Sequence, residues 1–154
     1  MRAVIQRVNY ASVKVDGVVK GKIKRGLCVL VGFAPGDHEP TLAQMADKIV
    51  NMRIFPNAQG RFDLSLLEIG GGVLLVPQFT LYADTRKGRR PDFFSALEPV
   101  SASQLFDKLI ATFEKTGAAQ VAAGVFGADM KVALENDGPV TILVELGAEG
   151  LMVW

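Results

Sequence analysis

The sequence predicts an α+β fold in which two main helices pack against a mixed, largely antiparallel β-sheet. Three observations indicate this class: strand-like segments outnumber helical ones, hairpin patterns dominate the early part of the chain, and two longer segments carry helical periodicity. Hydrophobic residues make up 49% of the 154 residues, enough for a sizeable core. No repeat or linker divides the chain, so we expect one domain over residues 1–154, with 147–154 as a short tail.

The first strands are predicted from apolar and alternating segments. RAVIQRV (2–8) suggests a strand, and SVKVDGVVKGKI (12–23) alternates apolar and polar residues around Asp16-Gly17. Because glycine accepts a positive φ angle, this dipeptide predicts the tight turn of a hairpin. GLCVLVGF (26–33) is typical of a central strand.

The first helix is predicted to begin near Pro40 and to end near residues 54–56. Pro40 suits the first helical turn, and either Asp37 or Glu39 could cap it. Its apolar face is formed by Leu42, Met45, Ala46, Ile49 and Met52.

The second helix is predicted from Ser101, because Ser-Ala-Ser-Gln, ending at Gln104, matches a capping box. Gly117 is placed to end this helix. Its apolar face is formed by Leu105, Phe106, Leu109, Ile110 and Phe113.

Four further strands are predicted, the first with a modified end. They are VLLVPQFTLYA (73–83), QVAAGVF (120–126), MKVALEN (130–136) and VTILVEL (140–146). The turn-forming composition of residues 136–141 favours a hairpin connection between the last two. The bond between Gly138 and Pro139 can alternatively be cis.

One cysteine and one histidine limit the chemistry available to the chain. Cys28 permits no internal disulfide, and its apolar neighbours indicate a buried structural residue. His38, in PGDHEP, is expected at the surface or at a helix start. A His-Cys zinc site needs more ligands, and a Ser-His-Asp triad would have to recruit His38 from a turn between two prolines. We therefore expect no metal and no cofactor.

The distribution of charge is more informative than the formal net charge of +1. The segment TRKGRRP (85–91) is either a solvated loop or a contact for phosphate, since it follows the strand at 73–83 directly. The cations of the segment are Arg86, Lys87, Arg89 and Arg90.

The longest apolar runs are too short to span a bilayer, and no secretory signal follows Met1. We expect a soluble, cytoplasmic protein.

The strand at 73–83 ends in a way that core packing alone would not select. Four apolar residues are followed by Pro77, Gln78 and Thr80 around a lone Phe79. Proline ends the hydrogen-bond ladder of a strand. We interpret Pro77 and Gln78 as turning the backbone towards a ligand.

Two motifs together resemble those of the D-aminoacyl-tRNA deacylases: PQFTL (77–81) and NDGPVT (136–141), on a chain that opens MRAVIQRV. The resemblance covers about the whole chain up to Leu146 and implies a barrel-like sheet with two helices packed on it. The supporting matches are ASVKVDG (11–17), RIFPNAQGRFDLS (53–65), ADTRKGRRPDF (83–93) and GVFGADMKVALENDGPVT (124–141).

This resemblance implies chiral proofreading. The family hydrolyses the ester between a D-amino acid, or glycine mischarged on tRNA(Ala), and the terminal ribose of tRNA. It also implies a homodimer with active sites at the interface, where a Gly-cis-Pro element enters the partner's pocket and excludes L side chains. The expected partners are therefore tRNA and a second copy of the chain, with no DNA and no membrane.

The selectivity element of the family corresponds to Gly138 and Pro139 in this chain. Arg7, in IQRV, matches the residue that orients this element. Phe126 and Met130, in GVFGADM, match positions near the terminal adenosine.

The catalytic motif of the family corresponds to Gln78, Phe79 and Thr80. Although the chain lacks the usual activated nucleophiles, an aminoacyl ester is reactive and brings a vicinal ribose hydroxyl. The protein can then act by positioning the ester and stabilising the oxyanion, with the backbone N–H groups of Gln78 and Phe79 as candidate donors. For Thr80 a positioning or structural role is favoured over covalent catalysis, because no general base is visible nearby in the sequence.

Pro77 departs from the usual first motif, SQFTL, and removes one backbone N–H. A related animal branch that removes wrongly attached L-alanine carries proline here, but usually has a small residue at the position of Phe79. Phe79 and NDGPVT favour the D-specific branch, while Pro77 leaves open a range that includes L-Ala-tRNA. Two different functions compete with the deacylase: a non-catalytic tRNA-binding module, and a thiol or serine hydrolase of small esters.

Overall fold

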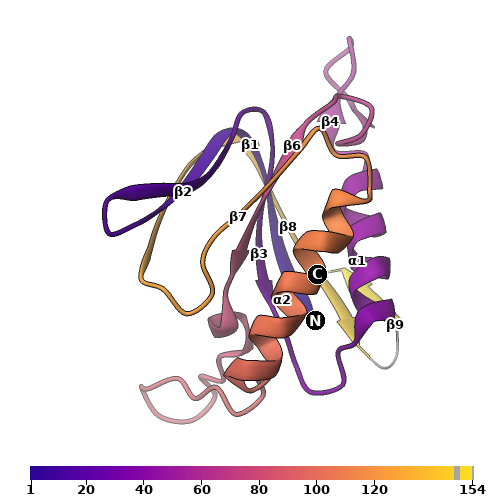
Figure 1. Ribbon diagram of the computed structural model, residues 1–154. Helices are drawn as coiled ribbons and strands as arrows, with labels where there is room; N and C mark the ends of the chain where they lie inside the picture. Colours follow the sequence, from indigo (N-terminus) through magenta and orange to yellow (C-terminus); the bar gives the residue numbers. More distant parts are fainter. Residues whose placement is uncertain (148–149, 154) are drawn as a thin grey trace.

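Two helices lie side by side on one face of a curved β-sheet in the computed structural model, which describes residues 1–147 and 150–153 (Figure 1). The helices are α1 (Glu39–Asn51) and α2 (Pro99–Glu114). The strands of the main sheet are β1 (Arg2–Val15), β2 (Val18–Ile23), β3 (Gly26–Gly32), β6 (Gly72–Pro77), β7 (Gln120–Ala123), β8 (Met130–Gly147) and β9 (Gly150–Val153).

The main sheet has the order β7-β6-β3-β1-β8-β9, with β2 paired to β1. The pairs β3–β6 and β6–β7 are parallel and the others are antiparallel. The sheet curls until β2 meets β7, where Gln120 Nε2 donates a hydrogen bond to the Lys22 carbonyl oxygen at 2.9 Å. These findings confirm the predicted α+β class and its mixed, largely antiparallel, barrel-like sheet.

The curvature of the sheet creates two hydrophobic clusters, one on each face. The larger cluster fills the space between the sheet and the helices, where Ile5 and Leu75 pack with Leu42 and Phe106. Fully burying such a side chain stabilises a fold by roughly 1.5–3 kcal/mol. The smaller cluster lies on the opposite face and contains the buried Cys28, as predicted.

The first helix begins as expected but is capped differently. Its N-cap residue is His38, which is exposed and whose Nδ1 lies 2.7 Å from Thr41 Oγ1. Neither Asp37 nor Glu39 caps the helix, because Asp37 accepts a hydrogen bond from the Ala34 N–H instead, and Glu39 is already helical. The helix also ends at Asn51, before the predicted 54–56.

The second helix begins earlier than its predicted capping box. Pro99 occupies the first turn, where a missing N–H costs nothing. The Glu98 carboxylate accepts hydrogen bonds from the N–H groups of Val100 at 2.9 Å and Ser101 at 2.7 Å. The prediction of a cap at Ser101 is therefore wrong, and Glu98 is the capping residue.

The predicted hairpin at residues 136–141 is also wrong, because β8 continues through this segment as one strand. Val8 of β1 pairs with Asn136, and Gln6 pairs with Thr141. Residues 137–140 therefore bulge opposite the single residue Arg7. The peptide bond between Gly138 and Pro139 is cis.

A small second sheet stands apart from the main one. It is a hairpin of β4 (Phe55–Pro56) and β5 (Phe62–Leu64), which follows α1. The predicted tail at 147–154 includes β9, which pairs antiparallel with β8. Among the helices of residues 1–147 and 150–153, none is long and apolar enough to cross a membrane.

Candidate active site

The strand β6 ends where the sequence predicts a modified end. Pro77 is its last residue and pairs with Val31 of β3. The Gln78 N–H then donates to the Val31 carbonyl oxygen at 2.7 Å, and the chain turns into a short 3-10 helix, η1 (Phe79–Tyr82). This turn displays Phe79 and Thr80 at the surface beyond the edge of the core.

The backbone donors at this turn differ from those expected. Because the Gln78 N–H is bonded to Val31, it is not free to bind a substrate, and the expectation for this group is wrong. The N–H groups of Phe79 and Thr80 begin the 3-10 helix and have no hydrogen-bond acceptor among the described residues. Two adjacent backbone donors are therefore available, one residue further along the chain than predicted.

The side chains of the motif are paired with each other. Gln78 Nε2 donates a hydrogen bond to Thr80 Oγ1. Within the part of the chain that the structure describes, no carboxylate, imidazole or amine contacts the Thr80 hydroxyl. Thr80 consequently lacks the base that an activated nucleophile requires.

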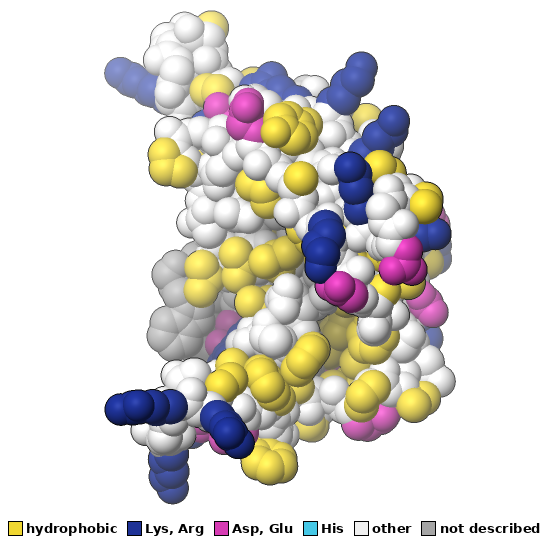
Figure 2. Space-filling view, turned by 90° about the vertical axis from the view of Figure 1, so that its left-hand side faces the viewer, with side chains coloured by type: hydrophobic (Ala, Val, Ile, Leu, Met, Phe, Trp, Pro, Cys, Tyr) yellow, Lys and Arg dark blue, Asp and Glu magenta, His cyan; other side chains and the backbone are white. Residues whose placement is uncertain are grey.

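Phe79 forms part of the wall of an apolar pocket with a volume of about 540 Å³. Its ring meets that of Phe93 edge to face, with centroids 4.9 Å apart. Figure 2 shows apolar side chains gathered around a hollow on this side of the molecule, with Lys and Arg side chains above and below. The lining residues are Pro77, Phe79, Phe93, Phe94, Ala96, Leu97, Glu98, Pro99, Ala102, Phe126 and Gly127.

The pocket unites residues that are far apart in the sequence. Pro77, Phe79 and Phe126, three of the predicted site residues, line it together. Met130 lies beside the pocket wall, because its sulfur accepts a hydrogen bond from the Val125 N–H at 3.4 Å and closes the loop that carries Phe126. Phe93 was not predicted, although its position after a basic segment could have indicated a ligand surface.

Arg2 contacts the turn after β6 through Leu81 and Tyr82. Arg2 Nη1 donates to the Leu81 carbonyl oxygen at 2.9 Å, and the guanidinium lies 4.5 Å from the centre of the Tyr82 ring. Burial, with a smaller contribution from Asp37, raises the pKa of the Tyr82 hydroxyl, which therefore stays neutral. The turn that carries Phe79 is thus anchored to β1 by polar and aromatic contacts.

The basic segment 85–91 forms an exposed loop beside the pocket. Asp84 and Asp92 close its base by donating N–H groups to each other's carbonyl oxygens at 2.9 and 3.0 Å. The Arg86 side chain folds back on the Asp84 carboxylate and holds its pKa at about 2. The other cations, Lys87, Arg89 and Arg90, have no ion-pair partner among the described residues and remain available to a polyanion.

The remaining predicted residues lie together at a different place on the sheet. Arg7 Nε donates to the Asp137 carbonyl oxygen at 3.0 Å and lies 3.1 Å from its carboxylate Oδ2. Gly138 and Pro139 follow on the exposed bulge. Because β1 and β3 separate β8 from β6, this group does not join Gln78 within one chain.

The titratable groups leave the pocket without an acid–base pair. Burial raises the pKa of the Cys28 thiol to about 11, inside the smaller cluster. His38 is held at the start of α1 and does not line the pocket. In residues 1–147 and 150–153, no three His, Cys, Asp or Glu side chains gather in an arrangement suited to a metal ion.

The fold and the site together define a nearly closed α+β sheet with an apolar pocket that lies beside exposed backbone N–H groups. The family model described as D-Tyr-tRNA(Tyr) deacylase matches residues 4–145. The D-aminoacyl-tRNA deacylase of Roseiflexus castenholzii is 55% identical over 145 residues, which cover 94% of this chain and 92% of that one. The D-aminoacyl-tRNA deacylase of Lactobacillus delbrueckii subsp. bulgaricus is 50% identical over 146 residues, 95% of this chain and 100% of that one. The chain belongs to the D-Tyr-tRNA(Tyr) deacylase family.

Two solved structures share the fold. The one described as c-Myc DNA Unwinding Element Binding Protein has a TM-score of 0.90 and 39% identity, covering 96% of this chain and 100% of that chain. The one described as a probable eukaryotic D-amino acid tRNA deacylase has a TM-score of 0.80 and 18% identity, covering 92% and 97%. At the lower identity the likeness concerns the fold alone.

Proposed function

We propose that this chain is a D-aminoacyl-tRNA deacylase, which hydrolyses the ester between a D-amino acid and the terminal ribose of tRNA. One observation carries this proposal: the PQFTL motif places two backbone N–H groups, at Phe79 and Thr80, at the edge of an apolar pocket, and neither has an acceptor in the described part of the chain. The same motif lies within the region matched by the family model.

Hydrolysis at this site would depend on positioning rather than on a side-chain nucleophile. The ester carbonyl would accept hydrogen bonds from the Phe79 and Thr80 N–H groups as negative charge develops on its oxygen. Loss of one such donor in other enzymes costs about 3–4 kcal/mol in the activation free energy, so backbone groups suffice for a large effect. The ribose hydroxyl next to the ester would supply the acid–base group, because the carboxylate that lines the pocket, that of Glu98, is engaged in capping α2.

The aromatic pocket suits the terminal adenosine of tRNA. Phe79, Phe93 and Phe126 offer ring faces and edges, and stacking of a base on an aromatic side chain contributes about 1–3 kcal/mol. The loop 85–91 would lie near the phosphates of the acceptor end and supply positive charge without reading the base sequence. A cytoplasmic location, where aminoacyl-tRNA is used, accords with this substrate.

Selectivity for D-amino acids and glycine, including glycine on tRNA(Ala), would come from the bulge that contains Gly138 and Pro139. In one chain this bulge is exposed and separated from Gln78 by two strands. A homodimer would bring the bulge of one copy to the pocket of the other, where its carbonyl groups would exclude an L side chain. Arg7, bonded to Asp137, would hold the bulge in the required orientation.

A deacylation assay tests this function. The chain should remove the amino acid rapidly from D-Tyr-tRNA and from Gly-tRNA(Ala), and should leave L-Tyr-tRNA intact. Inclusion of L-Ala-tRNA tests the wider range that Pro77 leaves open. A gel-shift measurement with D-Tyr-tRNA in parallel detects binding, and binding without ester loss would favour the non-catalytic module.

A matched variant tests the mechanism. Thr80→Val removes the hydroxyl but keeps the backbone N–H and nearly the same volume, so it should retain most of the deacylase activity. Loss of activity by three orders of magnitude in a folded Thr80→Val protein would contradict a backbone-based mechanism. A chelator in the same assay should leave the rate unchanged, because no three His, Cys, Asp or Glu side chains of the described residues gather in an arrangement suited to a metal ion.

A further inference from the structure

The Arg7 guanidinium contacts two segments that are far apart in the sequence. On one side it bonds Asp137 in the bulge of β8. On the other side, Arg7 Nη1 donates to the Ile54 carbonyl oxygen at 2.6 Å, just before the β4–β5 hairpin. The Arg7 side chain is 8% exposed, so these contacts form in a largely desolvated place.

The β4–β5 hairpin supplies a third contact to the same guanidinium. The centre of the Phe62 ring lies 5.4 Å from Arg7 Cζ, within the range of a cation–π interaction. Phe62 is 57% exposed, which is unusual for a phenylalanine whose only task is core packing. Its ring therefore lies over Arg7 at the surface rather than inside either hydrophobic cluster.

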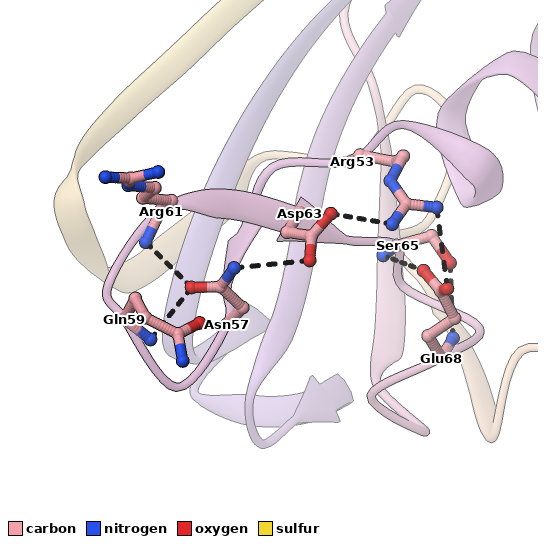
Figure 3. A network of polar contacts seen from close by, with 7 residues as sticks. All are labelled: Arg53, Asn57, Gln59, Arg61, Asp63, Ser65 and Glu68. Carbon is pink, nitrogen blue, oxygen red and sulfur yellow. Dashed lines mark hydrogen bonds and ion pairs between the residues drawn. The ribbon is translucent and has the colours of Figure 1, made fainter.

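The hairpin is too short to hold Phe62 by strand pairing alone, since β4 has two residues and β5 has three. A polar network braces it instead (Figure 3). Asp63 accepts hydrogen bonds from Arg53 Nη2 at 2.8 Å and from Asn57 Nδ2 at 3.2 Å. Asn57 Oδ1 in turn accepts from the N–H groups of Gln59 and Arg61 at 2.9 and 3.1 Å, which fixes the connecting turn.

The network is also tied to the segment that follows the hairpin. Arg53 Nη1 lies 3.6 Å from Glu68 Oε1, and the Ser65 N–H donates to Glu68 Oε2 at 2.6 Å. The hydrogen bond from Arg53 holds the pKa of the Asp63 carboxyl below its usual range, in keeping with a charged acceptor. Phe62 is consequently carried by a short loop with a defined shape on both of its flanks.

We propose that Phe62 is a positioning residue for substrate discrimination: its ring and the Ile54 carbonyl hold the Arg7 guanidinium, which fixes the bulge at residues 137–140. The position of the bulge then depends on the β4–β5 hairpin through the contacts that both make with Arg7. This inference rests on the proposed function, in which the bulge excludes L-aminoacyl esters. A looser bulge would admit L side chains while leaving the backbone donors at Phe79 and Thr80 unchanged.

Phe62→Leu tests the proposal, with Phe62→Tyr as the conservative variant and Arg61→Ala as the matched control. Leucine keeps an apolar side chain but removes the ring, whereas tyrosine keeps the ring. The Arg61 side chain lies in the same hairpin and is exposed, so its loss leaves the Arg7 contacts in place. We expect Phe62→Leu to lower the ratio of kcat/KM for D-Tyr-tRNA over L-Tyr-tRNA about tenfold, mainly through faster loss of the L ester.

The Gly138 amide provides a readout that does not depend on deacylase activity. In Phe62→Leu its ¹⁵N–¹H resonance should shift and its hydrogen exchange should accelerate, while Phe62→Tyr and Arg61→Ala should match the wild type. An unchanged Gly138 amide in folded Phe62→Leu protein would overturn the link between hairpin and bulge. A shifted amide with an unchanged D-to-L ratio would overturn the role in discrimination. Failure of the wild type to hydrolyse any D ester would refute the proposed function while the amide measurement still decides the structural link.

Discussion

The Phe79 and Phe93 rings meet edge to face, with centroids 4.9 Å apart and planes inclined by 68°. Phe79 belongs to the turn after β6, and Phe93 follows the basic loop. An aromatic pair of this geometry contributes about 0.5–1.5 kcal/mol beyond the area it buries. The contact therefore couples the strand end that carries the backbone donors to the loop that carries the positive charge.

Phe93→Ala should weaken substrate binding more than it slows the chemical step. Removal of the ring widens the pocket and frees Phe79, so we expect KM for D-Tyr-tRNA to rise about three- to tenfold with a smaller change in kcat. Phe93→Tyr keeps the ring and should behave like the wild type. Steady-state kinetics on both variants check this, and a large fall in kcat at constant KM would show that Phe93 acts on the transition state instead.

Neutralising Lys87, Arg89 and Arg90 together should weaken tRNA binding and reduce its dependence on salt. Each phosphate contact that is lost lowers the slope of log K against log salt concentration by about 0.7–0.9. Arg86→Gln alone should have a smaller effect, because Asp84 already offsets its charge. Binding of tRNA from low to moderate salt measures the slope.

The control for this experiment is the equally charged set Lys20, Lys22 and Lys24 on or beside β2, which is also exposed but does not belong to the loop at the pocket. Its replacement by glutamine should change the slope less than replacement of the loop cations. An equal loss in both triple variants would indicate that only the bulk charge of the protein matters.

The end of β6 shows how far local chemistry can be read from the sequence. Proline and polar residues after an apolar run predict a strand end with exposed backbone, and the structure has that arrangement. The sequence could not predict which backbone N–H stays free. The Gln78 N–H donates to the carbonyl oxygen of Val31, a residue far earlier in the chain that lies beside β6 only once the sheet has formed. Hydrogen-bond partners of this kind depend on tertiary pairing.

The bulge in β8 shows the opposite case. Asn-Asp-Gly-Pro is equally compatible with a hairpin and with an interruption of one strand. The choice is decided by β1, which pairs with both flanks of the segment, at Val8 and at Gln6. Arg7 then lies opposite the extra residues, so the same long-range pairing that defines the bulge also places Arg7 where it can bond the bulge.

The pocket depends on tertiary structure in a similar way. Phe93 and Phe94 join the pocket only because the loop 85–91 folds back on itself.

Gly26→Ala should destabilise the fold strongly. Gly26 pairs with Gly72 in the parallel β3–β6 ladder, and an added Cβ would lie 1.9 Å from the Gly72 carbonyl oxygen. Because the obstacle is backbone at the first pair of two interior strands, these strands would have to separate there, and we expect a loss on the order of 3–5 kcal/mol in the free energy of unfolding. Gly147→Ala is the matched control, since no atom of the described residues lies within 4 Å of its added Cβ. Denaturant unfolding compares the two, and similar stabilities would contradict the packing at Gly26.

Cys28 should make the fold less stable as the pH rises from about 9 to about 11. Burial raises the pKa of this thiol from an ordinary 9.0 to about 11, so the folded state keeps a neutral thiol over a range in which the unfolded chain forms a thiolate. Ionisation then favours the unfolded chain, and two pKa units correspond to about 2.7 kcal/mol.

The difference in the free energy of unfolding between the wild type and Cys28→Ala should therefore shrink between about pH 9 and pH 11, while titration of all other groups cancels in the comparison. Denaturant unfolding at several pH values measures this difference, and alkylation by iodoacetamide should remain slow at pH 8 in the folded protein. A constant difference from pH 8 to pH 11, or rapid alkylation at pH 8, would show that water reaches the thiol and that the smaller hydrophobic cluster is open.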